Sequence, residues 1–212
     1  MTQLLKVRFL AVALLAAGSL VSTLSAQSPL LAAEVKGILG RAQFSTGGGP
    51  YLPLKGGTVL RPGDVVQTAS QSALDLYLGP AAGTVRLTGS ATLSIDKMMV
   101  NDTTSDVELH LKGGEMLGKV SATAGASRFV VKTAGGFGAV VTGEFRFDAR
   151  GDLVLLEGKA LFVTTPDSGE PVANSLSAPP AVVYMPGSGV RPAPAELQKE
   201  VRKQAKVKLP KG

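Results

Sequence analysis

The segments Ala73–Leu78 (A-L-D-L-Y-L), Val107–Leu111 (V-E-L-H-L) and Glu144–Phe147 (E-F-R-F) alternate apolar and polar residues along the middle of the chain. In an extended backbone, successive side chains point to opposite faces, so each segment has one apolar and one polar face. Such segments recur from Gly57 to Val163, separated by glycine-containing turns. This pattern predicts consecutive antiparallel strands whose apolar faces meet in one core.

The alternation also predicts where individual strands lie. A first strand is expected over Glu34–Phe44, bent at Gly37 or Gly40. Two hairpins are expected, one from Val107–Leu111 to Glu115–Val120 across Lys112–Gly114, and one from Leu153–Leu156 to Ala160–Thr164 across Glu157–Gly158. Further strands are expected at Tyr51–Leu54, Val65–Thr68, Leu74–Leu78, Thr84–Thr88, Thr92–Ile95, Ser127–Thr133, Gly138–Val141 and Thr142–Asp148.

The predicted fold class is all-β, with two antiparallel sheets packed as a sandwich or a flattened roll. A short β-solenoid-like coil of repeated strand-turn units is the alternative. The expected domain is 34–165, followed by a Pro/Gly-rich extension over 166–189 in which Val182–Tyr184 is a candidate last strand.

The basic tail, 190–212, contains helix-forming residues without glycine over Ala195–Lys206, which predicts a C-terminal helix. Leu197, Val201 and Ala205 form a narrow apolar stripe on it, which can pack on the body, lie on an anionic surface or face solvent.

The N-terminus has the pattern of an export signal over 1–26. Lys6 and Arg8 precede an apolar stretch, Phe9–Leu24, and small residues follow it. Two cleavage points fit, between Ala26 and Gln27 or after Ala33. A retained membrane anchor is the alternative, although a spanning helix needs about 20 apolar residues.

Composition narrows the function classes. The chain has no cysteine, so it has no disulfides, thiolate metal sites or cysteine nucleophile. Its formal charge of +6 comes from its two ends. Lys6 and Arg8 lie in the N-terminal segment, and from Arg191 onward there are seven basic residues and only two acidic ones. Nucleic-acid binding by the central body therefore has no support. The helix cations Lys199, Arg202, Lys203 and Lys206 are the candidate contact for an anionic envelope surface.

Seven segments, in order, resemble the FecR domain, the ligand-sensing periplasmic module of bacterial iron-citrate signalling. They are Leu60–Thr68, Ala73–Gly79, Thr84–Ile95, Leu109–Met116, Phe129–Thr133, Val141–Phe147 and Leu155–Val163. The resemblance covers about 130 residues, and it implies a β module that binds ligands or other proteins. It implies structural roles, and no catalytic ones, for Gly63, Asp64, Thr68, Thr133, Gly143, Phe145 and Gly158.

The chain departs from the FecR pattern in three places. Ala134 stands where the family usually has proline, and Glu144 follows Gly143 where threonine is usual. A signal peptide also replaces the cytoplasmic anti-sigma region and membrane helix of the signalling members. Control of a sigma factor is therefore not implied.

Few residues are candidates for chemistry. His110, the single histidine, lies on the polar side of its strand and is expected at the surface. Asn101–Asp106 with Glu108 offers oxygen ligands but lacks the glycine of a calcium loop, so a solvated loop is expected and a weak calcium site is the alternative. Gly135–Gly138 and Arg150–Asp152 are expected to be turns. No cofactor and no metal are expected.

A hydrolase would need two carboxylates that flank one bond. Asp64, Asp75, Asp96 and Asp148 are expected at turns or outward strand positions, and Tyr51, Tyr77 and Tyr184 are the few aromatics available for sugar stacking. The sequence therefore favours a non-catalytic exported module that binds a ligand or protein partner. The alternatives are an envelope scaffold anchored by the basic tail and, last, a hydrolase.

Overall fold

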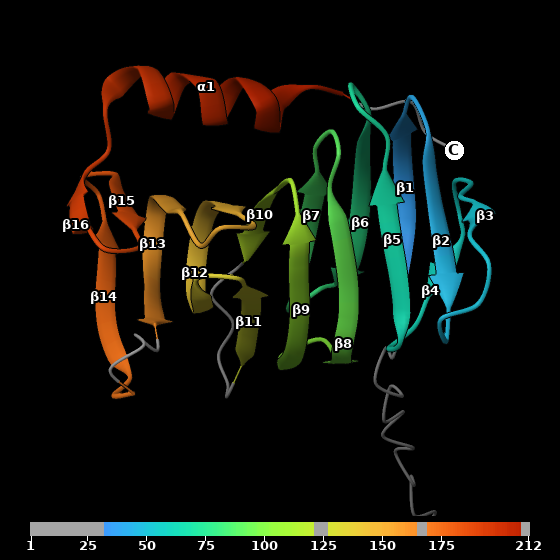
Figure 1. The fold of residues 1–212 in the computed structure, drawn as a ribbon, viewed down its shortest axis with the longest axis horizontal. Coiled ribbons are helices and arrows are strands. Elements are labelled where there is room, and N and C mark those ends of the chain that lie inside the picture. Colours follow the sequence, from blue (N-terminus) through green and yellow to red (C-terminus); the bar gives the residue numbers. More distant parts are fainter. Residues whose placement is uncertain (1–31, 121–126, 165–168, 209–212) are drawn as a thin grey trace, which may run out of the picture.

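In a computed structural model, residues 32–120, 127–164 and 169–208 are described. They form sixteen strands and one helix, so the protein is mostly β with a C-terminal helix (Figure 1). The elements are β1 (Ala33–Leu39), β2 (Ala42–Thr46), β3 (Leu52–Pro53), β4 (Val59–Leu60), β5 (Asp64–Thr68), β6 (Ala73–Gly79), β7 (Gly83–Leu87), β8 (Thr92–Val100), β9 (Ser105–Gly113), β10 (Glu115–Val120), β11 (Arg128–Thr133), β12 (Gly136–Asp148), β13 (Leu153–Thr164), β14 (Val172–Ala178), β15 (Val182–Met185), β16 (Gly189–Pro192) and α1 (Ala195–Lys206).

The strands belong to one large curled sheet that forms a half-barrel. Its main order is β3-β2-β5-β8-β9-β11-β12-β10-β7-β6-β1-β4, and β13 to β16 continue it beyond β12. In Figure 1, β2, β5, β8 and β9 lie in front of β1, β6 and β7. The expected pair of separate sheets is therefore corrected to one sheet, because β12 pairs with β11 at one end and with β10 at the other.

The sheet is also mixed, whereas only antiparallel pairing was expected. β9 and β11 are parallel, with Phe129 opposite Val107, while the other described pairs are antiparallel. Residues between β9 and β11 include all of β10, which lies on the far side of β12. A crossover of this length permits parallel pairing, which a tight turn does not.

The core lies inside the curl and collects the apolar face of nearly every strand. Leu74, Leu76 and Leu78 of β6 are fully buried, as the alternation predicts. A row of aromatic rings runs from Phe129 through Phe145, Phe147 and Phe162 to Tyr184, with neighbouring centroids 4.6–6.3 Å apart. Each such buried side chain contributes about 1.5–3 kcal/mol of gross stabilisation, so the core needs no disulfides.

The predicted hairpin across Lys112–Gly114 is wrong, although both of its strands exist. β9 pairs with β8 and β11, whereas β10 pairs with β7 and β12. The chain crosses at Gly114, which has a φ of +72° and packs against Ala91 so closely that a Cβ would clash with it. Gly40, with a φ of +77°, makes a similar crossing from β1 to β2, at one of the two bends expected in the first strand.

The second predicted hairpin is also wrong, because Leu153–Thr164 is one strand, β13. Gly158 lies opposite Gly143 of β12, and their φ values are +100° and +113°. A Cβ on Gly143 would overlap the carbonyl of Glu157, so the two strands bend together where both side chains are missing. Glu157–Gly158, which the sequence predicted to be a turn, is a bend within one strand.

The C-terminal region holds more structure than expected. The candidate strand Val182–Tyr184 lies in β15, and β14 and β16 were not predicted. The helix over Ala195–Lys206 is confirmed. No helix among the described residues has the length and apolar character to cross a membrane. The signal segment and its cleavage point at Ala26 and Gln27 lie outside the described residues.

Candidate functional site

Helix α1 packs with its apolar stripe on the outer face of the sheet. Val201 is 2% exposed and Leu197 is partly buried, and both contact a small cluster on the outer faces of β10, β13 and β15. That cluster contains Leu117, Val154 and Leu156, whose sequence neighbours Met116, Leu153 and Leu155 face the main core. Leu197 and Val201 of the stripe therefore pack on the body, which was the first of the three alternatives left by the sequence, whereas Ala205 remains exposed.

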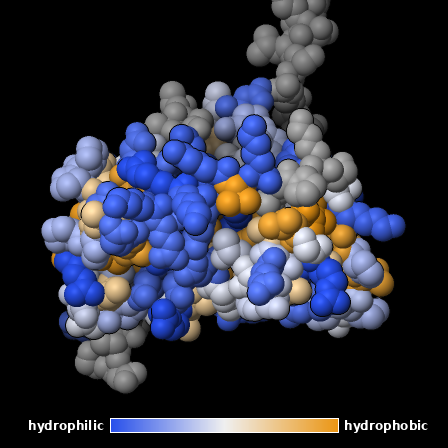
Figure 2. All heavy atoms as spheres, turned by 90° about the horizontal axis from the view of Figure 1, so that it is seen from above, coloured by the Kyte–Doolittle hydropathy of each residue, from blue (hydrophilic) through white to orange (hydrophobic). Residues whose placement is uncertain are grey.

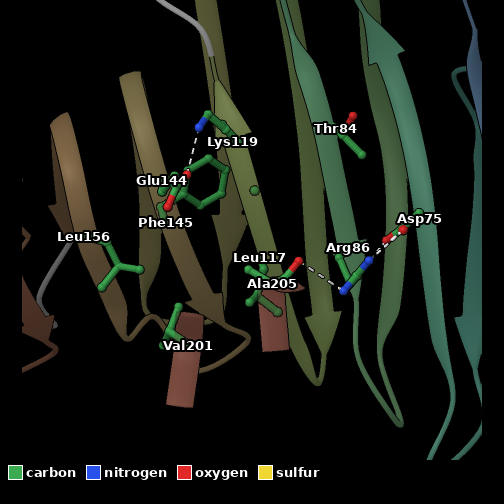
Figure 3. Close-up of a pocket in the computed structure, with 11 residues that line it drawn as sticks. Asp75, Thr84, Arg86, Leu117, Lys119, Glu144, Phe145, Leu156, Val201 and Ala205 are labelled. Carbon is green, nitrogen blue, oxygen red and sulfur yellow. Dashed lines mark hydrogen bonds and ion pairs between the residues drawn. The ribbon is translucent and has the colours of Figure 1, made fainter. Parts of the chain in front are cut away.

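Arg86 of β7 fixes the C-terminal end of α1. Its guanidinium donates one hydrogen bond to each carboxylate oxygen of Asp75, and both are 2.7 Å long. Nη1 also donates to the backbone carbonyl of Gln204, at 2.7 Å. Figure 3 shows Arg86 between Asp75 and the carbonyl of Ala205. Carbonyls of a last helical turn lack partners within the helix and carry partial negative charge, so the partly buried Arg86 stabilises this end.

A cavity of about 210 Å³ remains between α1 and the sheet. Leu117, Leu156, Val201 and Ala205 line its apolar part (Figure 3). The ion pair of Arg86 with Asp75 lies on one side, and that of Lys119 with Glu144, at 2.8 Å, lies on the other. The hydrogen bond to Glu144 raises the pKa of Lys119. These charges are matched in pairs, so the cavity offers no unpaired charge to a ligand.

The opposite side of α1 is exposed and basic. Lys199 and Lys203, like Arg202 and Lys206, are four residues apart, and the four cations line a shallow hollow with Val207. The view onto α1 is accordingly mostly hydrophilic (Figure 2). Lys199 pairs with Glu196 at 2.7 Å, whereas no ion pair within the described residues involves Arg202, Lys203 or Lys206. Because the other side of α1 is anchored, these cations are held as a fixed surface, here called the basic face.

A second charged surface lies on the outer side of β8, β9 and β11, and here each charge has a partner. Lys97 pairs with Asp106 at 2.5 Å, Arg128 bridges Asp106 and Glu108, and Lys132 bridges Glu108 and Asp96 at 3.0 and 3.1 Å. We call these six residues the ion-pair ladder. Hydrogen bonds from Arg128 and Lys132 lower the pKa of Glu108, and one from Lys97 lowers the pKa of Asp106.

The four candidate carboxylates are not brought together. Asp75 is held by Arg86, Asp96 by Ser94 and Lys132, and Asp148 by Arg150. Asp64 is buried in its turn and accepts from the backbone N–H of Arg61. These four carboxylates therefore form no pair that faces a common cleft.

The other candidate residues occupy ordinary positions. His110 is half-buried in β9 between Ser94 and Lys132 of the neighbouring strands. Asn101 closes its loop by accepting from the backbone N–H groups of Thr103 and Thr104. Among the described residues, no three His, Asp or Glu side chains could hold a metal ion. Tyr184 is buried, whereas Tyr51 is exposed and Lys36 lies over the ring of Tyr77.

The two glycine-containing segments differ from each other. Arg150–Asp152 is the turn between β12 and β13, as expected, with the N–H of Gly151 donating to Asp148. Gly135–Gly138 is only partly a turn, because Gly136 already begins β12.

The residues implied by the FecR resemblance lie at bends and in the core. Gly63 has a φ of +95° in its turn, and Phe145 is buried in the aromatic row. Thr68 donates to the carbonyl of Thr88 and accepts from the N–H of Ala91. Thr133 donates to the carbonyl of Gly136. Asp64 closes its turn, and Gly143 and Gly158 form the shared bend of β12 and β13.

Sequence reasoning missed Arg86, although part of the signal was present. Asp75 and Arg86 are both outward positions of adjacent strands and lie opposite each other, but a bulge between Tyr77 and Gly79 shifts the register by one residue, so counting back from the turn would pair Asp75 with Leu87 instead. Nothing in the local sequence indicates that the helix 118 residues later ends above them.

Comparison with known proteins adds no assignment. No protein-family model matches the chain, and no curated protein matches it.

Proposed function

We propose that this chain is an exported, non-catalytic FecR-type β module, a flattened roll that binds a partner in the bacterial envelope through the basic face of α1. The observation that carries the proposal is the fixed display of Arg202, Lys203 and Lys206 without anionic partners among the described residues. The three cations of the ion-pair ladder, in contrast, are already neutralised by neighbouring carboxylates.

The docked position of α1 determines the kind of contact. A free amphipathic basic helix binds membranes by inserting its apolar side. Here Val201 and Leu197 are occupied by the sheet, so α1 offers mainly charge. The partner is accordingly an anionic surface or an anionic protein, bound electrostatically and released by salt. The four candidate carboxylates are held apart, and those of the ion-pair ladder are bound by cations, which supports binding over hydrolysis.

Vesicle sedimentation tests the proposal directly. The protein is expected to bind vesicles of 30% phosphatidylglycerol in phosphatidylcholine at low salt, and to dissociate as salt shortens the screening length to about 8 Å at 0.15 M. Replacing Lys199, Arg202, Lys203 and Lys206 by glutamine should abolish binding. A matched control replaces four exposed cations elsewhere by glutamine, namely Lys55, Arg61, Lys112 and Lys159.

The control separates position from net charge, because both variants lose four positive charges. Equal loss of binding in the two variants would contradict a localised basic face. Binding that survives both would remove the proposal. A pull-down from envelope extract with the same two variants distinguishes a stoichiometric protein partner from bulk association with the envelope, the expectation for a scaffold.

Export is part of the same proposal, with cleavage between Ala26 and Gln27. Cleavage after Ala33 would cut within β1, where Ala33 is fully buried opposite Leu60. The intact mass of the secreted protein is therefore expected to correspond to a chain that begins at Gln27. A mass beginning at Glu34 would contradict this choice of site.

A further inference from the structure

The half-barrel leaves several strand edges open, and they differ in how well they are protected. Among the described strands, β3 and β4 end the main order, β14 pairs only with β13, and β16 pairs only with β15. Each such edge presents unpaired backbone N–H and C=O groups, which are a template for pairing with another strand. Natural proteins usually block these edges with short strands, proline, charges or bulges.

Three of the four edges carry such blocks. β3 has two residues, one of them Pro53, and β4 also has two and is followed by Arg61 and Pro62. β1, beside β4, is interrupted by a bulge between Val35 and Gly37. β16 ends in Arg191 and Pro192.

β14 has none of these blocks. It runs for seven residues, V-A-N-S-L-S-A, with neither charge nor proline, and its register with β13 is continuous from Val172 to Ala178. Ala173, Ser175 and Ser177 are small and exposed on the outer side, while Leu176 faces the core. The strand is bounded by Pro171 and Pro179, which limit pairing to these seven residues.

Exposed apolar side chains lie beside this edge. Leu161 of β13 is directly opposite Ser175 and is 36% exposed, and Phe137 of β12 is 42% exposed. Both belong to the outer side of the sheet, as Ala139 lies opposite Leu161 and Val163 opposite Phe137. A strand added to β14 would therefore extend a sheet face that already bears apolar groups.

We propose that β14 pairs with β14 of a second copy of this chain, antiparallel, about a two-fold axis at Ser175. Full overlap of the seven residues puts Ser175 opposite itself, Ala173 opposite Ser177 and Val172 opposite Ala178. A second copy fits better than a charged peptide because the strand is uncharged and small, so it meets itself without repulsion or clash. A two-fold axis also repeats each contact, which makes such an edge self-complementary. This inference is independent of the basic face.

The two-fold axis gives a charge-swap test. Residues directly opposite in an antiparallel pair have Cβ atoms about 4.5–5.5 Å apart, so like charges there repel. Full-length mature protein is expected to dimerise in sedimentation-equilibrium runs, with a dissociation constant of about 10–100 μM for so small an interface. S175K alone and S175E alone should each be monomeric, and an equimolar mixture of the two should dimerise again.

Controls distinguish pairing at β14 from a general effect of charge. V190K places the same lysine on β16, an edge that is already blocked, and should leave dimerisation unchanged. Thermal unfolding of each variant verifies the monomer fold, since Ser175 is exposed. A wild-type chain that stays monomeric up to about 1 mM would overturn the proposal. Dimers that persist in S175K, or that V190K disrupts instead, would also overturn it.

Discussion

The ion-pair ladder on β8, β9 and β11 and the basic face of α1 are two charged surfaces with opposite organisation. In the ladder, three cations and three anions from three strands neutralise one another. On α1, cations are aligned by helical spacing, and acidic Glu196 and Glu200 lie to one side of them on the same helix. The charges of the ladder are paired within the sheet, whereas cations of the basic face are available to a partner. Charge content alone therefore does not reveal a binding surface; the partners of each charge do.

Arg86 connects the second surface to the body, and its loss should have the largest effect. Arg86→Ala leaves Asp75 and the last carbonyls of α1 unpaired in a mostly buried place, where the two side chains are 13% and 19% exposed. We expect the free energy of unfolding to fall by about 2–3 kcal/mol. Trypsin should also cut α1 in the otherwise folded protein. Arg150→Ala, which removes an arginine whose side chain is 80% exposed, is the control. Unchanged protection of α1 would show that Arg86 does not hold it.

Removing the charge at the centre of the ladder should lower the free energy of unfolding by less than the loss of Arg86 does. Glu108 accepts from both Arg128 and Lys132, so Glu108→Gln removes the charge that joins them. The expected loss in urea denaturation at pH 7 is about 1 kcal/mol, because the partners are half-exposed. Vesicle binding should be unaffected. A loss of vesicle binding in this variant would mean that the ladder, despite its internal pairing, contributes to binding.

The ladder also predicts an acid dependence of stability. Asp106 and Glu108 have lowered pKa values in the fold, from ordinary values of 3.8 and 4.5, so their pairing stabilises the protein fully above these values. That contribution is lost as pH falls through the lowered pKa values. The difference in stability between the wild type and a variant with Asp106→Asn and Glu108→Gln should therefore shrink from pH 7 to pH 3. A constant difference would contradict the assignment.

Neutralising the basic face should have the smallest effect on stability. The four glutamine substitutions that remove vesicle binding change exposed side chains, so the free energy of unfolding should move by less than about 0.5 kcal/mol. A larger loss of stability would mean that these cations support the fold. The basic face would then not differ from the ion-pair ladder in this way.

The sequence predicted single strands well because alternation is a local property. β6, β7, β10 and β11 lie within a residue or so of their expected positions, and α1 matches its expected range. Connections were predicted poorly. Gly113–Gly114 and Glu157–Gly158 have the composition of turns, yet the first joins opposite sides of the curl and the second lies within β13. Glycine reports a backbone conformation or a close approach, and only tertiary pairing decides which.

The candidate site was half visible in the sequence. The sequence predicted a C-terminal helix whose cations Lys199, Arg202, Lys203 and Lys206 are the candidate contact for an anionic surface. Whether that helix is anchored depends on Leu117, Leu156 and Arg86, which are distant in sequence and become neighbours only after the sheet curls. The absence of charge in β14 was equally visible, but its meaning required knowing that β14 is an edge.

The central position of β12 has a consequence for the order of events as the chain folds. β11 and β10 precede β12, yet each needs it as a partner, so a nascent chain that ends before Gly136 has two unjoined halves with β11 and β10 as temporary margins. Assembly of the curl must wait for the later third of the polypeptide. A chaperone that binds nascent chains would therefore be needed most before β12 has been synthesised.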